Sequence, residues 1–276
     1  FSEDKAVVLE GKINGRVTVT GKGTLKSSLS CSGFDGATPS TIHITGGEII
    51  GVSKDSPVIQ LSAANLIVEG DSTVILNANH SSGSVESCDT ISATGGVQIT
   101  IRGGTIQSSG GRALYIYRKG DSVLADSYAS LLVEGGTISG AKYGIYNTEH
   151  NEVTIKGGTI HGDTSDIFLA HNITQIPRAP KKFAVENKSS SKPFPFAKMQ
   201  IERLSSTNEI DFTKAKLNAD DKLSIVLDSG AEAGKLFRVS TKEYRSFLKQ
   251  IELSGPATPV CVVYNSAEPS ASQNAT

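Results

Sequence analysis

Ile99-Thr-Ile-Arg-Gly-Gly-Thr-Ile106 is one copy of a repeated phrase from which the fold of this chain can be predicted. Two aliphatic residues alternate with polar ones, a glycine follows, and a further aliphatic residue comes soon after it. Six versions of this phrase occur within the first 160 residues, and their first glycines are 22 to 33 positions apart. Repeats of this length are typical of a solenoid, in which each repeat forms one coil. The first glycines of the copies are Gly21, Gly46, Gly70, Gly103, Gly135 and Gly157.

Aligning the copies on these glycines separates the side chains into columns. Side chains in a strand alternate between its two faces, so positions two and four before the glycine share a face. All twelve of these residues are aliphatic, and most are β-branched, as strands prefer. We therefore expect both columns to face the interior: Val17, Ile42, Leu66, Ile99, Leu131 and Val153, and then Val19, Ile44, Val68, Ile101, Val133 and Ile155.

Each coil contains further apolar positions after the glycine. A third inward column is expected at Leu25, Ile49, Val74, Ile106, Ile138 and Ile160, and a second short strand supplies Ile59, Ile91, Leu114, Ile145 and Ile167. Doubled glycines such as Gly103-Gly104 permit a tight corner between strands. The pattern predicts an all-β parallel β-helix, stabilised by stacking of coils about 4.8 Å apart.

The residue before each first glycine should face outward. This column runs Thr20, Thr45, Glu69, Arg102, Glu134 and Lys156, so opposite charges would meet on neighbouring coils. Such cross-strand pairs stabilise a sheet. We therefore assign Arg102 to a structural ladder of charges rather than to catalysis.

The outward column of the second strand contains aromatic residues at Tyr115, Tyr146 and Phe168, with Tyr117 and Tyr143 flanking them. Two interpretations fit this column. The rings either stack on one another to cover the sheet, or they form a flat platform on which sugar rings bind.

Two coils are longer than the others by about eight to ten residues. Insertions in solenoids form loops, and such loops often carry function. One of these loops contains Arg118, Lys119, Asp121 and Asp126. These charges are either solvated loop residues or part of a binding or calcium-assisted site.

Composition excludes several classes of protein. The 276 residues include 27 Lys and Arg against 28 Asp and Glu, a net charge of -1, which argues against nucleic-acid binding. No apolar run reaches the roughly 18 residues of a membrane span. The histidines lack metal-binding spacing, so no metal site is expected. Cys31, Cys88 and Cys261 are expected to be buried or half-buried rather than to include a Cys31–Cys88 disulfide.

The repeat divides the chain into regions. We expect the β-helix over residues 1–172, a connecting segment rich in Pro, Lys and Ser over 173–198, and a small β-rich unit over 199–264 that either caps the last coil or folds independently. Residues 265–276 have the composition of a disordered tail. The start at Phe1 favours a mature chain or an excised fragment.

The phrase Val133-Glu-Gly-Gly-Thr-Ile138 and its copies resemble the Gly-Gly-Thr-Ile repeats of β-helical surface proteins from Gram-positive bacteria. The stretch from Cys88 to Gly104 is similar to coils of β-helical carbohydrate-binding domains, distant relatives of pectate lyases. The resemblance covers roughly residues 5–170. It implies a right-handed parallel β-helix, export to the cell surface, and glycan binding or adhesion. Calcium binding in such folds uses clustered aspartates, whereas only Asp89 occupies the matching position here.

The leading hypothesis is therefore a non-catalytic, extracellular or cell-surface module that binds polysaccharide or host glycan, as a monomer or as part of a larger surface protein. The first alternative is a calcium-assisted polysaccharide lyase with Arg118 or Lys119 as the base, near Asp121 or Asp126. The Arg-x-Pro-x-x-Arg segment of lyases is absent, and a β-helix alone does not imply catalysis. The second alternative is a structural stalk without a ligand of its own.

Overall fold

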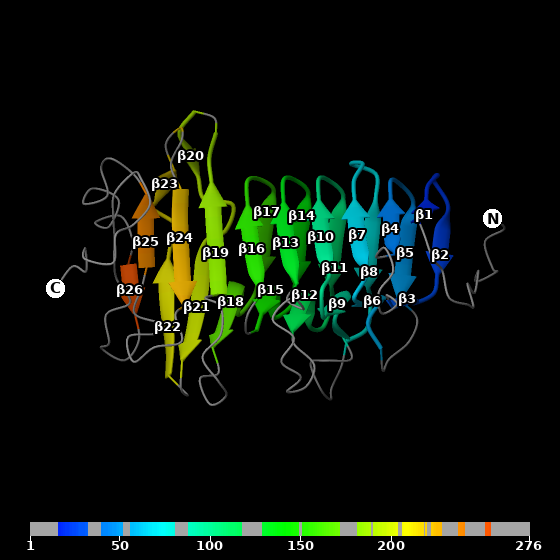
Figure 1. Ribbon diagram of the computed structural model, residues 1–276, viewed down its shortest axis with the longest axis horizontal. Helices are drawn as coiled ribbons and strands as arrows, with labels where there is room; N and C mark the ends of the chain where they lie inside the picture. The colour runs from blue at the N-terminus through cyan, green and yellow to red at the C-terminus, as the bar shows by residue number, and fades with distance from the viewer. Residues whose placement is uncertain are drawn as a thin grey trace.

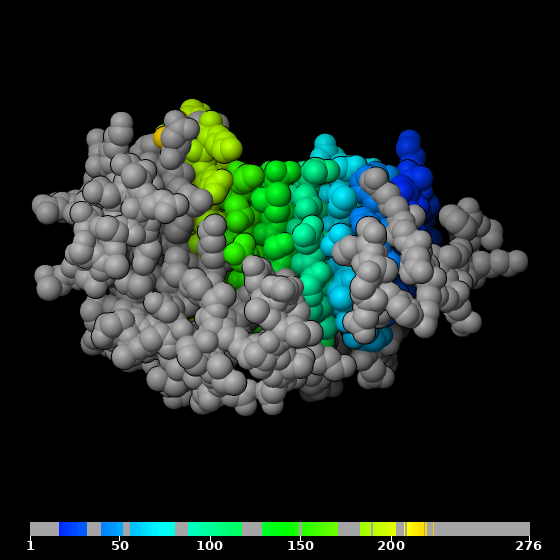
Figure 2. Space-filling view, viewed as in Figure 1, coloured from blue at the N-terminus to red at the C-terminus, as the bar shows by residue number. Residues whose placement is uncertain are grey.

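The structure is a computed structural model in which the described part of the chain consists of β-strands joined by turns and short irregular segments and contains no α-helix. It describes residues 16–32, 40–51, 56–80, 88–117, 129–148, 151–171, 181–188, 190–203, 206–217, 219, 222–227, 237–240 and 252–254. Successive coils stack along the longest axis of the molecule (Figure 1). The same coils appear as adjacent bands, in sequence order, in the space-filling view (Figure 2).

Three sheets run along the stack, and every coil from β1 to β18 contributes one strand to each. The first sheet contains β1 (Arg16–Val19), β4 (Thr41–Ile44), β7 (Asn65–Val68), β10 (Gln98–Ile101), β13 (Ser130–Val133), β16 (Glu152–Ile155), β19 (Lys181–Glu186), β24 (Lys222–Leu227) and β25 (Phe237–Ser240). The second contains β2 (Thr24–Lys26), β5 (Glu48–Gly51), β8 (Val74–Asn77), β11 (Thr105–Ser108), β14 (Thr137–Gly140) and β17 (Thr159–Gly162). The third contains β3 (Leu29–Ser32), β6 (Ile59–Ser62), β9 (Ile91–Thr94), β12 (Arg112–Tyr117), β15 (Tyr143–Asn147), β18 (Ser165–His171), β21 (Lys198–Arg203), β22 (Ser206–Asp211) and β26 (Glu252–Ser254).

Strands β1 to β16 and β18 each pair in parallel with the strand of the same sheet in the next coil. An all-β chain with three such parallel sheets fits a parallel β-helix, as predicted. A short antiparallel pair, β20 (Lys192–Pro193) and β23 (Lys216–Leu217), lies apart from the three sheets.

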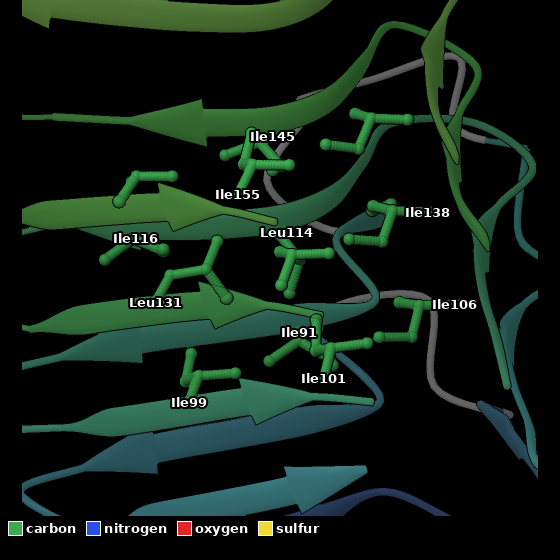
Figure 3. Close-up of a cluster of buried hydrophobic side chains, with 14 of the residues drawn as sticks. Ile91, Ile99, Ile101, Ile106, Leu114, Ile116, Leu131, Ile138, Ile145 and Ile155 are labelled. Atoms are coloured by element: carbon green, nitrogen blue, oxygen red, sulfur yellow. The ribbon is translucent and has the colours of Figure 1, made fainter. Parts of the chain in front are cut away.

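The register confirms the predicted inward columns of the first sheet. Ile99 pairs with Leu66 and Leu131, and Ile101 pairs with Val68 and Val133. These side chains are almost wholly buried. The interior is filled by branched aliphatic residues from all three sheets, as the core close-up shows (Figure 3).

The inward column of the third sheet is also confirmed, since Ile59, Ile91, Leu114, Ile145 and Ile167 are all fully buried. The prediction for the second sheet was wrong at one position. Ile75, not Val74, aligns with Ile49 and Ile106 and is fully buried.

The doubled glycines form the corners between the first and second sheets. A Cβ on Gly135 would lie 2.4 Å from the carbonyl oxygen of Arg102 on the previous coil, a distance that no real contact tolerates. Gly136 has a φ of 81°, in the left-handed region that favours glycine. The first glycine therefore permits close approach of coils, and the second permits the turn.

Parallel pairing continues beyond residue 172. The expected connecting segment contains β19, whose Phe183 and Val185 extend the two inward columns of the first sheet. β21 then extends the third sheet, where Met199 pairs with Ile167. The expected start of the C-terminal unit, at residue 199, therefore falls inside a strand of a parallel sheet.

After these strands the pairing changes from parallel to antiparallel. β24 pairs antiparallel with β19, and β22 pairs antiparallel with β21. The second sheet ends differently, because the amide of Ile160 in β17 donates a hydrogen bond to the carbonyl oxygen of Pro195 at 2.8 Å. A buried cluster of aromatic rings covers this end of the core: Phe183, Phe194, Phe196 and Phe212. The described part of residues 199–264 thus includes strands continuous with the sheets.

Cys31 and Cys88 are buried and are not joined by a disulfide, as expected, whereas Cys261 lies outside the described residues. Burial raises the pKa of the Cys31 thiol. Within the described ranges, no helix has the length and apolar character needed to cross a membrane.

Candidate binding site

Five aromatic side chains form one continuous cluster on the outer side of the third sheet. We call this cluster the tyrosine face; its members are Tyr115, Tyr117, Tyr143, Tyr146 and Phe168. The strand register produces it, because Tyr115, Tyr146 and Phe168 are paired on the neighbouring strands β12, β15 and β18. The structure therefore brings together all five aromatic residues that the sequence selected.

The rings do not form a flat platform. Tyr115 stacks on Tyr117, with centroids 4.6 Å apart, and Tyr146 stacks on Phe168 at 4.5 Å. The two stacked pairs meet edge to face, since Tyr115 and Tyr146 are inclined by 73°. Tyr143 packs edge-on against both Tyr146 and Phe168. This packing is the mutual stacking that the first interpretation predicted.

An ion pair lies against the tyrosine face. The carbon of the Arg112 guanidinium is 3.6 Å from the centre of the Tyr115 ring and 5.1 Å from that of Tyr146. Its Nε and Nη2 atoms each donate to a carboxylate oxygen of Asp89 at 2.7 Å. Both residues are buried, with 6% and 1% of their surface exposed. A bidentate pair of this kind fixes the guanidinium plane, so it also fixes the ring beside it.

These contacts decide which atoms of the tyrosine face a ligand can reach. Tyr115 is packed on both faces, by Arg112 and by Tyr117. Tyr117 is half-buried, and among the described residues no second ring or cation packs on it. The hydroxyls of Tyr117, Tyr143 and Tyr146 have no hydrogen-bond partner among the described residues. Among the described residues, a ligand would therefore meet hydroxyls, ring edges and one face of Tyr117 rather than a row of open ring faces.

The environment of two phenols favours their neutral form. Burial raises the pKa of Tyr146 to about 12, and the negative charge of Glu202 adds to this effect. Burial and Glu202 raise the pKa of Tyr143 in the same direction. Both phenols therefore stay neutral at physiological pH, where they can donate and accept hydrogen bonds.

The predicted ladder of charges is present on the outer side of the first sheet. Arg102 contacts Glu69 at 3.2 Å and Glu134 at 3.3 Å, and Lys156 lies 3.9 Å from Glu134. His43 extends the ladder, with its Nε2 atom 2.5 Å from Glu69. Hydrogen bonds from His43 and Arg102 lower the pKa of Glu69. Arg102 therefore has the structural contacts that its column predicted.

The second set of candidates, Arg118, Lys119, Asp121 and Asp126, lies outside the described residues. No group of three or more potential metal ligands occurs in the ranges that the structure covers. The sequence analysis did not identify Arg112, the pairing of Arg112 with Asp89, or Glu202 as parts of this site. Arg112 is the first residue of the strand that carries Tyr115 and Tyr117. A positive charge so close to two aromatic residues could have indicated that Arg112 belongs to the site.

No protein-family model matches the chain, and comparisons with curated proteins and with solved structures found no match.

Proposed function

We propose that this protein is a non-catalytic module that binds polysaccharide or glycan through the tyrosine face. The observation that carries the proposal is the set of three phenol hydroxyls, on Tyr117, Tyr143 and Tyr146, that have no described protein partner. They belong to rings whose positions are fixed by mutual packing. Sugars present hydroxyls and C–H groups, which match phenol hydroxyls and aromatic surface.

Rigidity supports this proposal over a chance exposure of tyrosines. Stacking and the buried Arg112–Asp89 pair hold the rings before any ligand arrives. Little side-chain entropy is then lost on binding, which increases affinity for a given set of contacts. Only one of the described rings, Tyr115, packs on Tyr117, so we expect Tyr117 to make the main apolar contact.

The test is retention on a panel of immobilised neutral polysaccharides, with a broad glycan array to choose the panel. Tyr143→Phe combined with Tyr146→Phe removes two hydroxyls and keeps the rings, and Tyr117→Ala removes the open ring. Both variants should lose retention by about tenfold or more. Thr137→Ala, an exposed change on the second sheet, is the control and should bind as the parent does. Equal retention of the parent and all variants would refute the proposal.

One observation favours a second function, a structural stalk. The rings and the charges of the outward columns largely satisfy one another, as a surface without a ligand would require. A stalk predicts that no glycan on the array binds saturably. The lyase hypothesis for Arg118, Lys119, Asp121 and Asp126 predicts unsaturated products from a uronate polymer, with or without calcium, and their absence would exclude it.

The remaining expectations belong to the same proposal. We propose right-handed coils, because parallel strands joined by crossovers are right-handed in nearly all known cases. The proposal also includes export to the cell surface and action as a monomer or within a larger surface protein. It assumes that no cofactor is required. The proposal assumes a β-helix that is covered by a C-terminal cap.

A further inference from the structure

The tyrosine face has an acidic end. In the third sheet, Ala170 lies on the same strand as Phe168 and pairs with Glu202 on the next strand, β21. Glu202 is two residues after Gln200, the direct partner of Phe168, so it is a diagonal neighbour of that ring. Its influence on the pKa of Tyr143 and Tyr146 agrees with this placement.

Small side chains separate Tyr117 from Glu202 along one outward column. The amide of Thr148 bonds to the carbonyl oxygen of Ile116, which places Thr148 beside Tyr117. Ala170 follows on the next strand and Glu202 on the one after that. Three strand spacings make this column about 14 Å long. The column therefore has larger side chains at both ends, smaller ones between them, and the rings of Tyr146 and Phe168 along one side.

Among the described side chains near the tyrosine face, ion pairs account for the charges of Arg112, Asp89, Lys198 and Glu209. Asp89 neutralises Arg112 through the bidentate contact. Glu209 lies 3.8 Å from Lys198 and accepts a hydrogen bond from Gln200. Glu202 is half-buried and has no ion-pair partner among the described side chains. Within the described part of the chain, it is thus the charge next to the tyrosine face that no ion pair compensates.

We propose that Glu202 binds the protonated amine of an amino sugar, so that the ligand of the tyrosine face is a polysaccharide containing free amino groups. This inference rests on the proposed glycan binding and specifies its ligand class. An ammonium group has three donors, and the Glu202 carboxylate and neighbouring phenol oxygens are acceptors. The ring faces are largely occupied, so recognition uses the carboxylate rather than a cage of open rings.

The experiment compares two oligosaccharides of equal length by calorimetry: a glucosamine hexamer and its N-acetylated counterpart, at about pH 6, where amines are protonated. The parent should bind the glucosamine hexamer at least about tenfold more tightly, as a charged hydrogen bond predicts. Glu202→Gln should abolish this preference and leave binding of the acetylated hexamer unchanged. Added salt should weaken the amine-dependent part of binding in the parent and have little effect on the variant.

Glu209→Gln is the matched control. It removes one negative charge at the neighbouring position of the same sheet, so it changes the net charge by the same amount. This variant should keep the preference for the glucosamine hexamer. An equal loss in both variants would show that general surface charge is responsible and would overturn the assignment to Glu202.

The outcomes also separate this inference from the proposal beneath it. Binding of both hexamers with equal affinity, reduced by Tyr117→Ala, would refute amine recognition and leave glycan binding in place. If neither hexamer binds and the glycan array is also empty, both proposals fail. Unchanged binding of the glucosamine hexamer by Glu202→Gln refutes the inference alone.

Discussion

Replacing Asp89 by Asn should be among the most destabilising conservative changes in the chain. The Asp89 and Arg112 side chains are 2% and 7% exposed, so the substitution leaves a guanidinium charge out of water without its counter-charge. Burial opposes the charged form of Arg112, and the hydrogen bonds and charge of Asp89, with smaller contributions from Tyr115 and Tyr146, bring its pKa above the ordinary value. Removing one partner of a buried pair costs about 3–5 kcal/mol.

Thermal unfolding followed by circular dichroism measures this effect. For a chain of this size each kcal/mol lowers Tm by about 2–4 °C, so Asp89→Asn should lower Tm by about 6–20 °C. Glu209→Gln breaks the Lys198–Glu209 pair, whose side chains are 51% and 32% exposed, and should cost only about 0.2–1 kcal/mol.

The double variant Asp89→Asn/Arg112→Met tests the cause. It removes the buried charge as well as its partner, so it should recover at least half of the lost stability, because an apolar side chain of similar volume often replaces a buried ion well. The reasoning is refuted if Asp89→Asn costs no more than Glu209→Gln, or if the double variant is less stable than Asp89→Asn.

Two further predictions concern the coil corner and the buried phenol. Gly135→Ala should destabilise the protein strongly in a urea titration, because its Cβ would lie 2.4 Å from the Arg102 oxygen, whereas Gly23→Ala, which meets nothing within 4 Å, should change stability little. The pKa of Tyr146, about 12, exceeds that of about 10 for an unfolded phenol, so its contribution to stability is complete below pH 10 and is lost as the pH rises through 12. Ultraviolet titration should show this late ionisation, and Glu202→Gln should lower that pKa. An unchanged pKa in this variant would contradict the placement of Glu202.

The inward columns could be predicted because a period of two leaves few alternatives once the glycines are aligned. The error at Val74 has a local cause. In the third coil Thr73 is fully buried, its hydroxyl donates to the carbonyl oxygen of Glu69 at 2.7 Å, and its amide bonds to Gly70. The corner therefore contains two more residues than the corners with doubled glycines, which moves the buried position to Ile75.

The coil that contains β19 was not predicted from the sequence, because the corner after β19 contains no glycine. Asn187 follows the strand and is 1% exposed. Its side-chain amide donates to the carbonyl oxygens of Leu217, at 2.9 Å, and Ser190, at 3.2 Å. The glycine phrase is absent here, although Phe183 and Val185 continue the apolar alternation.

The aromatic cluster could be predicted from its column, but the groups that position it could not. Asp89 and Arg112 are 23 positions apart and come from different coils. Nothing in their spacing along the chain identifies them as partners. The same holds for Glu202, whose coil was not recognised as part of the sheets.

The ladder of charges limits how this chain can gain or lose coils. Glu69, Arg102, Glu134 and Lys156 alternate in sign along the outer side of the first sheet. Deletion of the single coil that carries Arg102 would bring Glu69 next to Glu134, two like charges on adjacent strands. Deletion of two consecutive coils would instead leave opposite charges in contact. Unequal recombination within such a gene would therefore be tolerated more readily in steps of two repeats than in steps of one.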